Sequence, residues 1–382
     1  MIHLRNDPES EADNSPSEMR SGPVPLNAVA EQQDFVCRFS GSRYDTGRFH
    51  GRHCRAGIHK ELANALRVTA EHFSTDEQGA MRSVSRYRPW VKQHLPRLLP
   101  EIQGIADGSG ISEEAAFFLA LWNGLKPSPK SDCTSLYCGK AVTADKSVYI
   151  GQTKDTPPQD GRYRVMHFNY SDGLELILLN YPGWIANVGI TSNGIGFTGN
   201  ALYSRQPPAE FVPCSLLLRA ILESSSSAEI LQYVEAEPWQ DGCLQIGTRS
   251  DNAYCVEFLS GRAFIRGITD TSNGHANSIL TPEMQHLDCS DKGLPCSQKR
   301  QETITQLLEK SPQKPGPDLI RMMLSDHRNS PESICHHAQS AQATRTTAAF
   351  YANLSLGWMD VAIGYPCVTP FVRHQLASAL TS

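Results

Sequence analysis

The sequence predicts an α+β fold in which antiparallel sheets are stacked and covered by helices. Helical periodicity dominates from residue 57 to residue 122, whereas short runs rich in β-branched and aromatic residues alternate with turn signals from Thr134 onward. Helical stretches return between these runs. Because consecutive hairpins build antiparallel sheets and the intervening helices cover them, this order is typical of a layered α+β protein.

Composition permits a buried core and excludes several classes of partner. The chain has 382 residues, of which 40% are hydrophobic, and a formal net charge of -5. No run of five or more Lys or Arg occurs, so we expect no nucleic-acid partner. No segment approaches the ~20 apolar residues of a membrane span, and the polar N-terminus lacks the apolar stretch of a secretory signal. We therefore expect a cytoplasmic protein with no membrane partner.

The first part of the chain divides into a polar tail and a helical leader. Residues 1–32 are rich in Ser, Glu, Asp, Asn and Pro, a composition that predicts a disordered tail. Residues 33–132 form the predicted helical leader. Two of its helices are indicated by apolar residues at helical spacing, Ile58, Leu62, Ala65, Leu66 and Phe73 in the first and Val91, Leu95, Leu98, Leu99, Ile102 and Ile105 in the second. A third begins after Gly110, where Ser112 can cap it.

The rest of the chain, residues 133–382, is predicted to form the sheets and their covering helices. Short turns separate the strands, at residues 144–146, 171–173, 193–194, 251–252 and 260–261. Helices are expected at about 214–224, 227–236, 298–310 and 316–326, and a last strand pair at about 346–363.

The eleven cysteines are expected to be free thiols, because their number is odd and no export signal precedes them. Two segments are dense in zinc-ligand types, Cys335-His336-His337 and the group of His50, His53, Cys54 and His59. Neither has the paired C-x2-C spacing of structural zinc sites. The sequence therefore predicts no metal and no cofactor.

Cys133 is the candidate nucleophile. It follows a Pro/Lys/Ser loop at residues 126–131, where the helical leader gives way to the first strand. A thiol there can attack the carbonyl of Asp132, and hydrolysis of the resulting thioester frees Cys133 as a new N-terminus. A free α-amine has a pKa of about 7.7 to 8.0 and can act as the base for its own thiol. Local sequence alone also fits a cysteine that is simply buried at the start of a strand.

Five further segments accompany Cys133 in a fixed order along the chain. Cys133-Thr-Ser-Leu-Tyr-Cys138 reads as a nucleophile strand, and Gly151-Gln-Thr-Lys-Asp155 as the strand that returns beside it. The others are Gly47-Arg-Phe-His50-Gly51, Gly189-Ile-Thr-Ser-Asn-Gly-Ile-Gly-Phe-Thr-Gly-Asn200, His275-Ala-Asn277 and Ala343-Thr-Arg345. Together they resemble the isopenicillin N acyltransferase family of N-terminal nucleophile hydrolases.

The resemblance implies a four-layer αββα sandwich and an enzyme that cuts itself between Asp132 and Cys133. The leader would then remain as a small subunit, and residues 133–382 would form the catalytic subunit. The enzyme would hydrolyse or transfer an acyl group at an amide bond through a thioester on Cys133. Its substrate would be a small amide or an acyl donor such as acyl-CoA.

The same resemblance assigns roles to the remaining site residues. Asp155 would orient the α-amine, Asn277 would donate to the oxyanion, and Arg345 would hold Asp155 or a substrate carboxylate. Gln152 and Asn200 would line the substrate site. Each also has a structural alternative, such as a turn, a cap or an ion pair.

Two other kinds of function stay open from sequence alone. The first is an uncut thiol hydrolase in which His275 or His50 activates Cys133. The second is a non-catalytic binding protein on the same fold. A serine hydrolase is disfavoured because the chain lacks a Gly-x-Ser-x-Gly motif.

Overall fold

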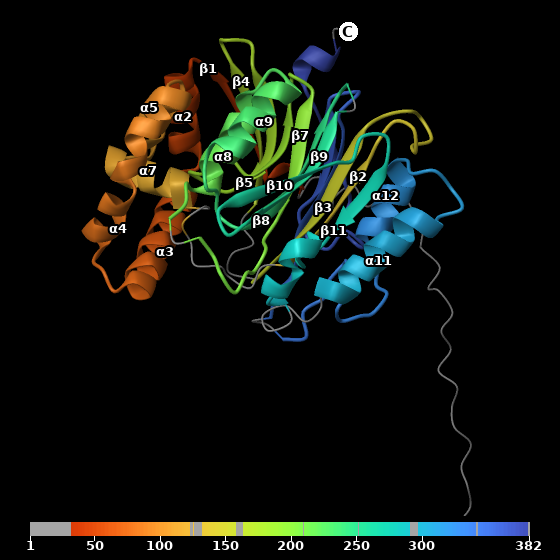
Figure 1. Ribbon diagram of the computed structural model, residues 1–382. Helices are drawn as coiled ribbons and strands as arrows, with labels where there is room; N and C mark the ends of the chain where they lie inside the picture. Colours follow the sequence, from red (N-terminus) through yellow and green to blue (C-terminus); the bar gives the residue numbers. More distant parts are fainter. Residues whose placement is uncertain are drawn as a thin grey trace, which may run out of the picture.

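The computed structural model describes residues 32–122, 125, 132–157, 163–208, 210–250, 252–290, 297–340 and 343–380. Two β-sheets are stacked face to face, with helices on the outer side of each (Figure 1). The predicted α+β class and its four αββα layers are confirmed. The expected disordered tail lies, apart from Gln32, outside the described residues.

Within the described residues, one sheet has eight strands and the other has six. The larger sheet, sheet A, runs in the order β1 (Val36–Gly41), β4 (Arg164–Tyr170), β5 (Glu175–Asn180), β6 (Val188–Thr191), β7 (Ile195–Asn200), β8 (Gly242–Thr248), β9 (Ala253–Leu259) and β10 (Arg262–Gly267). The smaller sheet, sheet B, runs in the order β11 (Ser272–His275), β2 (Asp132–Cys138), β3 (Tyr149–Thr156), β12 (Arg345–Asn353), β13 (Trp358–Ala362) and β14 (Val372–Gln375).

The turns predicted at residues 144–146, 171–173, 193–194 and 260–261 join neighbouring strands as expected, whereas Asp251 of the turn predicted at 251–252 lies outside the described residues. Asn193-Gly194, for example, connects β6 to β7, and Gly194 takes the positive φ of 75° that such a turn favours. Helices α8 (Cys214–Glu223) and α9 (Ser227–Ala236) cover sheet A. Helices α11 (Ser297–Lys310) and α12 (Pro317–Leu324) cover sheet B. Short 3-10 helices lie at Ser85–Tyr87, Pro282–Leu287 and Ala377–Leu380.

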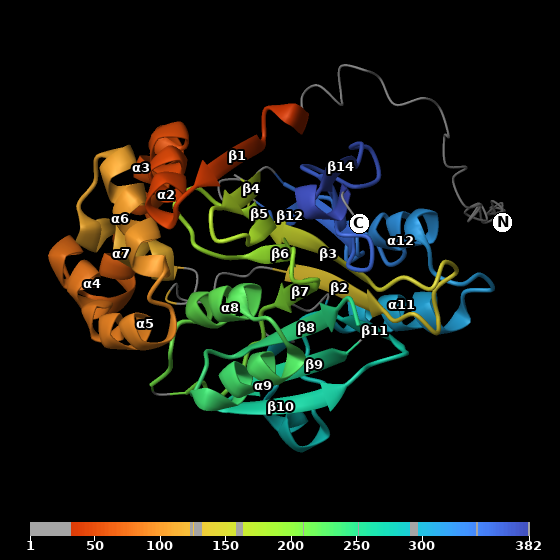
Figure 2. The same cartoon turned by 90° about the horizontal axis from the view of Figure 1, so that it is seen from above.

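The described part of the leader before Asp132 is mainly helical, but it contains one strand that the sequence analysis missed. Its helices are α2 (Arg43–His53), α3 (Arg55–Phe73), α4 (Glu77–Ser83), α5 (Arg88–His94), α6 (Leu98–Ser109) and α7 (Glu113–Leu121). Strand β1 precedes them and pairs in parallel with β4, more than a hundred residues later in the chain. Figure 2 shows β1 beside β4 at the edge of sheet A. The leader is therefore built into the sheet as well as packed beside it.

The leader helices differ from the prediction in two further details. The second predicted helix is two helices, because Leu95 precedes Pro96 and leaves the helical region with φ −132° and ψ 53°. Phe73, expected on the buried face, ends α3 and is 58% exposed. The cap at Ser112 is confirmed, since its side chain accepts a hydrogen bond from the Ala115 N–H at 3.1 Å.

Glycines let α2 and α6 pack backbone against backbone. A Cβ at Gly47 would lie 2.0 Å from the Glu101 carbonyl oxygen, and one at Gly51 would lie 2.4 Å from the Ile105 carbonyl oxygen. Between these glycines, His50 is fully buried, accepts the Gly183 N–H at Nε2 and stacks on Phe39. Burial lowers the pKa of His50 to about 3. The Gly-x-x-His-Gly segment thus joins the leader helices to one another and to the loop after β5.

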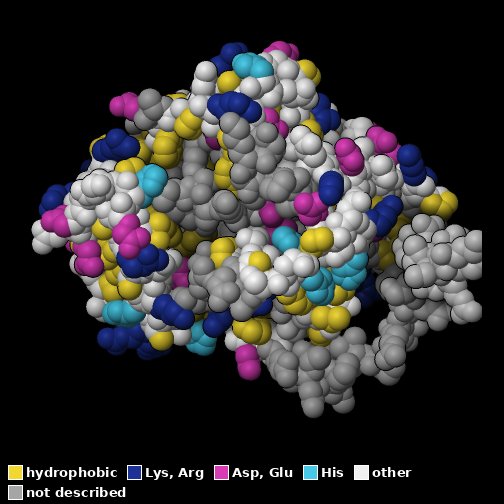
Figure 3. Space-filling model, turned by 90° about the horizontal axis from the view of Figure 1, so that it is seen from below, with side chains coloured by type: hydrophobic (Ala, Val, Ile, Leu, Met, Phe, Trp, Pro, Cys, Tyr) yellow, Lys and Arg dark blue, Asp and Glu magenta, His cyan; other side chains and the backbone are white. Residues whose placement is uncertain are grey.

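The surface shows no single dominant charge on the face drawn in Figure 3, where basic and acidic side chains intermingle. Among the described helices, none is long and apolar enough to pass through a bilayer.

Candidate active site

Cys133 lies at the start of a buried central strand. β2 is hydrogen-bonded to β11 on one side and to β3 on the other, and all its residues are buried. Cys133 is directly opposite Lys154 on β3, so the two side chains share one face of sheet B. Both side chains line a cavity of about 540 Å³. Cys133 is only 4% exposed, so the thiol is buried and still borders the cavity.

The backbone on either side of the Cys133 side chain is held by hydrogen bonds. Its N–H donates to Asn277 Oδ1 at 2.9 Å. Its carbonyl oxygen accepts from Arg300 Nη1 at 2.7 Å and from Asn200 Nδ2 at 3.1 Å. Three segments distant in sequence therefore fix the backbone of Cys133.

Two carboxylates and Arg300 meet on the opposite face of the β2–β3 hairpin. Asp132 is directly opposite Asp155, and neither lines the cavity among the residues described there. Arg300, on α11 and fully buried, forms an ion pair with Asp132 at 2.9 Å and donates to Thr134 Oγ1 at 2.9 Å. The thiol thus faces the cavity, while the carboxylates lie on the other side of the bond that joins Asp132 to Cys133.

Burial shifts the pKa values of the two central groups upward. Burial raises the pKa of Asp155 to about 7, and the neighbouring Asp132 adds to the rise, although Arg300 opposes it. Asp155 Oδ1 accepts a hydrogen bond from Thr346 Oγ1 at 2.6 Å. Burial likewise raises the pKa of the Cys133 thiol, and the positive charge of Lys154 opposes that rise. Near neutral pH, Asp155 can therefore both take up and release a proton.

The amide of Asn277 has a defined orientation. Its Oδ1 accepts from the Cys133 N–H and from Arg300 Nη2 at 3.1 Å, and its Nδ2 donates to the Ala201 carbonyl at 2.9 Å. An amide nitrogen carries two hydrogens, and Ala201 itself lines the cavity. Asn277 thus contacts the Cys133 backbone and Ala201, it is not among the described residues that line the cavity, and its oxyanion role stays a prediction.

Asn200 and Gln152 connect sheet A to the β2–β3 hairpin. Asn200 donates to the carbonyls of Cys133 and His275 and accepts from Ser135 Oγ. It also lines the cavity. Gln152 is fully buried, donates to the Gly199 carbonyl at 2.6 Å and accepts the Gly199 N–H at 3.2 Å. The Gln152 amide is therefore occupied by the backbone of β7, and substrate contact stays a prediction for both residues.

Arg345 is at the edge of this group. It opens β12 opposite Thr156, is half-buried, and forms no side-chain hydrogen bond or ion pair with the described residues. The guanidinium beside the carboxylates belongs to Arg300 instead. The expected contact of Arg345 with Asp155 is thus absent from the described part of the uncut chain, and a contact with substrate stays a prediction.

The sequence analysis missed Arg300 and Lys154. A signal for Arg300 was present, because it lies one turn before Ile304 on the inward face of α11, where an unpaired charge would be costly. Lys154 was inside a quoted motif, and its position opposite Cys133 follows once the hairpin register is known.

The histidines weighed as partners of Cys133 have other contacts. His275 Nε2 is 2.7 Å from Glu257 Oε1, and its Nδ1 is 2.8 Å from the Ala276 carbonyl oxygen. Burial opposes the charged form of His275, but the hydrogen bond to Glu257 leaves its pKa raised. His50 is bound to Gly183, as described above. Neither ring forms a hydrogen bond with Cys133 among the described contacts.

The cavity is lined mainly by aromatic and aliphatic side chains. Tyr163, Tyr181, Trp184 and Phe211 supply aromatic surface, and the remaining apolar lining includes leucines from α8. The polar lining includes Lys154 and Asn200 beside Cys133, and also Asn187, Gln240 and Asp241. A pocket of this kind suits a ligand with an apolar body and one polar reacting group.

Comparison with known proteins gives one similar sequence and several similar structures. A protein of Emericella nidulans described as acyl-coenzyme A:6-aminopenicillanic-acid-acyltransferase 40 kDa form is 24% identical over 322 residues, which cover 80% of this chain and 86% of the relative. A mutant conjugated bile acid hydrolase of Clostridium perfringens superimposes with a TM-score of 0.43 at 11% identity, over 64% of this chain and 93% of the other. Penicillin V acylase of Agrobacterium tumefaciens gives a TM-score of 0.39 at 11% identity, over 60% and 82%.

The family profile gives a second sequence match. Residues 142–364 match the family described as acyl-coenzyme A:6-aminopenicillanic acid acyl-transferase. The matched part contains Asp155, Asn200, Asn277 and Arg345, and it begins shortly after Cys133. Since it spans more than half of the chain, the chain belongs to the acyl-coenzyme A:6-aminopenicillanic acid acyl-transferase family.

Proposed function

We propose that this chain is the precursor of a self-processing cysteine enzyme that hydrolyses or transfers an acyl group at an amide bond. The observation that carries the proposal is the position of Cys133. Its side chain borders the apolar cavity, while its backbone N–H and carbonyl are held by Asn277, Asn200 and Arg300. An attacking group and its peptide bond are thereby fixed in one geometry, as intramolecular attack requires.

Self-cleavage would begin with attack of the Cys133 sulfur on the carbonyl carbon of Asp132. The C–S bond forms, the C–N bond breaks, the released amine gains one proton from Asp155, and the thiol proton restores the protonated Asp155. Protonated Asp155 is suited to donate to the departing nitrogen, since its pKa is about 7 and it lies opposite Asp132. Water then breaks the thioester, which leaves a carboxyl group on Asp132 and restores the thiol.

The new α-amine would serve as the base in each later turnover. Asn277 Oδ1, which accepts the Cys133 N–H in the uncut chain, is positioned to hold that amine. The thiol attacks the substrate carbonyl, its proton passes to the amine and then to the leaving group, and an acyl thioester forms on Cys133. Attack by water gives hydrolysis, and attack by a second amine gives acyl transfer. The second amide hydrogen of Asn277 would donate to the oxyanion.

The leader would remain bound as a small subunit. β1 is an edge strand of sheet A, and the leader helices bury apolar side chains such as Ile58, Ile102 and Phe117. These contacts are independent of the bond between Asp132 and Cys133. The two fragments should therefore elute together from a gel-filtration column and separate only in denaturant.

The cavity and the named relative together favour a substrate with an apolar acyl group. Lys154 provides a positive charge beside the thiol, suited to a carboxylate or phosphate on the substrate. Acyl-CoA, named for the Emericella nidulans relative, combines an acyl group with phosphates and is the first donor to test.

The test of this function is a search for the acyl-enzyme. Purified protein is mixed with acyl-CoA or N-acyl anilides of increasing acyl length, quenched in acid and analysed by peptide mass spectrometry. We expect a labile acyl adduct on the peptide that contains Cys133, released faster when a free amine is added. Cys289→Ala, which removes another thiol lining the cavity, is the matched control and should retain the adduct. Turnover with no adduct, or an adduct on another cysteine, would contradict the proposal.

A further inference from the structure

A second cluster of reactive side chains lies outside the candidate active site. Within the described residues, His327, Cys335, His337 and Cys367 bring two imidazoles and two thiols together, with all ligand atoms within 4.8 Å of one another. The first three come from the segment after α12, and Cys367 comes from the connection between β13 and β14. No residue of this cluster takes part in the mechanism proposed above.

The distances within the cluster match a tetrahedral zinc site. With Zn–N of about 2.05 Å and Zn–S of about 2.3 Å, tetrahedral geometry places two nitrogens about 3.3 Å apart and a nitrogen and a sulfur about 3.6 Å apart. His327 Nε2 and His337 Nε2 are 3.3 Å apart. Cys335 Sγ and Cys367 Sγ lie 3.6 Å and 3.3 Å from His337 Nε2.

The segments that carry these side chains are held in place by other contacts. The His337 ring stacks on Tyr365, with centroids 4.1 Å apart and planes inclined by 6°. The Cys335 N–H donates to the Asp326 carbonyl, and Ser333 Oγ donates to the Cys335 carbonyl. On the other segment, the Val368 N–H donates to the Tyr365 carbonyl. The ligands are therefore pre-positioned, which lowers the ordering cost of binding an ion.

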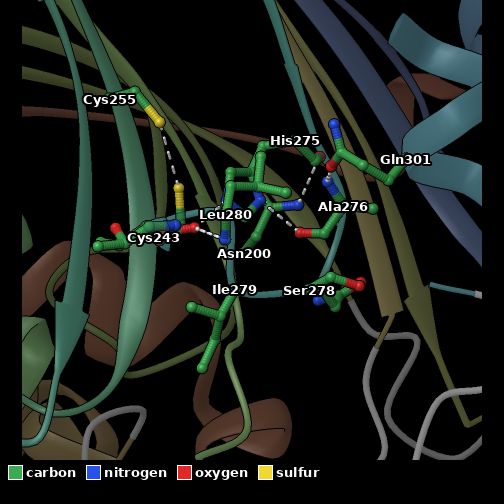
Figure 4. Close-up of polar contacts among 12 residues, drawn as sticks. Asn200, Cys243, Cys255, His275, Ala276, Ser278, Ile279, Leu280 and Gln301 are labelled. Atoms are coloured by element: carbon green, nitrogen blue, oxygen red, sulfur yellow. Dashed lines mark hydrogen bonds and ion pairs between the residues drawn. The ribbon is translucent and has the colours of Figure 1, made fainter. Parts of the chain in front are cut away.

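The other His/Cys group in the described residues does not offer such a site. Cys243, Cys255 and His275 also lie within 4.8 Å of one another. However, both His275 nitrogens are engaged, by Glu257 and by the Ala276 carbonyl. Figure 4 shows Cys243 and Cys255 facing each other across their strands, with sulfur atoms 3.9 Å apart. This group has two thiols and no available imidazole.

We propose that His327, Cys335, His337 and Cys367 bind one structural zinc ion. The two cysteines bind as thiolates and release their protons, and the two histidines bind as neutral imidazoles. The two negative charges then balance the double positive charge of the ion, which suits a partly buried site. Four protein ligands complete the tetrahedron and leave no position for water, so the ion holds the two segments together and takes no part in catalysis.

Two hydrogen bonds connect the proposed zinc site to Asp155. The backbone N–H of His336, between two ligands, donates to Thr346 Oγ1 at 2.8 Å. Thr346 Oγ1 in turn donates to Asp155 Oδ1 at 2.6 Å. Zinc would therefore order the segment that fixes the hydrogen bond to Asp155. Removal of the ion should speed amide hydrogen exchange at His336 and Thr346, a readout that is independent of activity.

Zinc content of the purified full-length protein is the direct test. Cells are grown with added zinc, the protein is dialysed against metal-free buffer, and metal is measured by inductively coupled plasma mass spectrometry. We expect about one zinc per chain in wild type and a loss of at least ~5-fold in Cys367→Ala and His327→Ala. Cys255→Ala, in the other His/Cys group, is the matched control and should retain the ion.

A second measurement keeps the test valid if a ligand variant fails to fold. Wild-type protein is exchanged with Co²⁺, and the visible bands of tetrahedral cobalt together with a thiolate-to-cobalt charge-transfer band are expected. Folded, reduced wild-type protein with less than ~0.1 zinc per chain and no cobalt spectrum would overturn the proposal. Zinc retained in Cys367→Ala, or a disulfide between Cys335 and Cys367 found by peptide mapping, would also overturn it.

Discussion

The ion pair between Arg300 and Asp132 supports the junction where cleavage is proposed, and its removal gives a quantitative prediction. Both side chains are buried, at 0% and 4% exposure, and their charged atoms are 2.9 Å apart. In Arg300→Met, the Asp132 carboxylate would remain buried without its ion-pair partner. Breaking a buried pair from one side typically costs about 3 to 5 kcal/mol.

The other contacts of Arg300 add less to this cost. The Cys133 carbonyl keeps its hydrogen bond from Asn200, and Asn277 Oδ1 keeps the one from the Cys133 N–H. We therefore expect Arg300→Met to lower the free energy of unfolding by about 3 to 5 kcal/mol, dominated by the loss of the positive charge beside the buried Asp132 carboxylate. Adding Asp132→Asn should recover about 1 to 3 kcal/mol, because the buried charge is then removed.

The assay is urea unfolding followed by tryptophan fluorescence, with every protein made in a Cys133→Ala background so that all chains stay uncut. Arg300→Lys keeps the charge but loses the bidentate donor geometry of the guanidinium. Its free energy of unfolding should lie between those of the parent and Arg300→Met. Two results would refute the reasoning. One is a free energy of unfolding for Arg300→Met within about 0.5 kcal/mol of the parent value. The other is a double variant whose loss of stability equals the sum of the losses in Arg300→Met and Asp132→Asn.

Three further predictions concern the mechanism, the pH dependence and the leader. Asn277→Ala in already processed protein should slow formation of the acyl-enzyme by ~10²- to 10³-fold, measured by quench and mass spectrometry, and a near-normal rate in a stable protein would return Asn277 to a structural role. The pKa of Asp155 is raised from 3.8 to about 7, so its contribution to stability is complete below about pH 3.8 and is lost as pH rises through about 7. In the Cys133→Ala background, the free energy of unfolding of Asp155→Asn relative to its parent should therefore rise by about 2 to 3 kcal/mol between pH 5 and pH 8, measured by urea unfolding, because about two pH units of that interval contribute. A pH-independent difference would count against the shift. Gly47→Ala should lower the melting temperature by several degrees, because its Cβ would meet a backbone oxygen at 2.0 Å, whereas Gly267→Ala, with open space around it, should change little.

Much of the fold follows from local sequence signals. The hairpin turns and the helices after residue 213 were predicted within a few residues, because Asn-Gly and similar turns and amphipathic spacing are local properties. β1 was missed because it is a short strand whose partner, β4, comes more than a hundred residues later. The break between α5 and α6 had a local signal in Pro96, which the apolar spacing across it masked.

The candidate sites were predicted less completely, because their residues come from elements that meet only after folding. Cys133, Asp155 and Asn277 were accessible to sequence analysis through a resemblance carried by short motifs. Arg300 has no such motif, and only the inward face of α11 brings it to Asp132. The proposed zinc ligands also meet only after folding. Cys367 comes from the connection between β13 and β14, and no paired C-x2-C spacing in the sequence indicates that it lies beside Cys335.

The intact mass of the purified protein, combined with N-terminal sequencing, tests the central claim most directly. Cleavage between Asp132 and Cys133 divides the 42.1 kDa chain in proportion to residue number, into fragments of about 14.5 and about 27.6 kDa. The account predicts both fragments in wild type, with the larger beginning Cys-Thr-Ser-Leu-Tyr, and a single uncut chain in Cys133→Ala. A wild-type protein that is catalytically active while its entire mass remains in one 42.1 kDa chain would contradict the account.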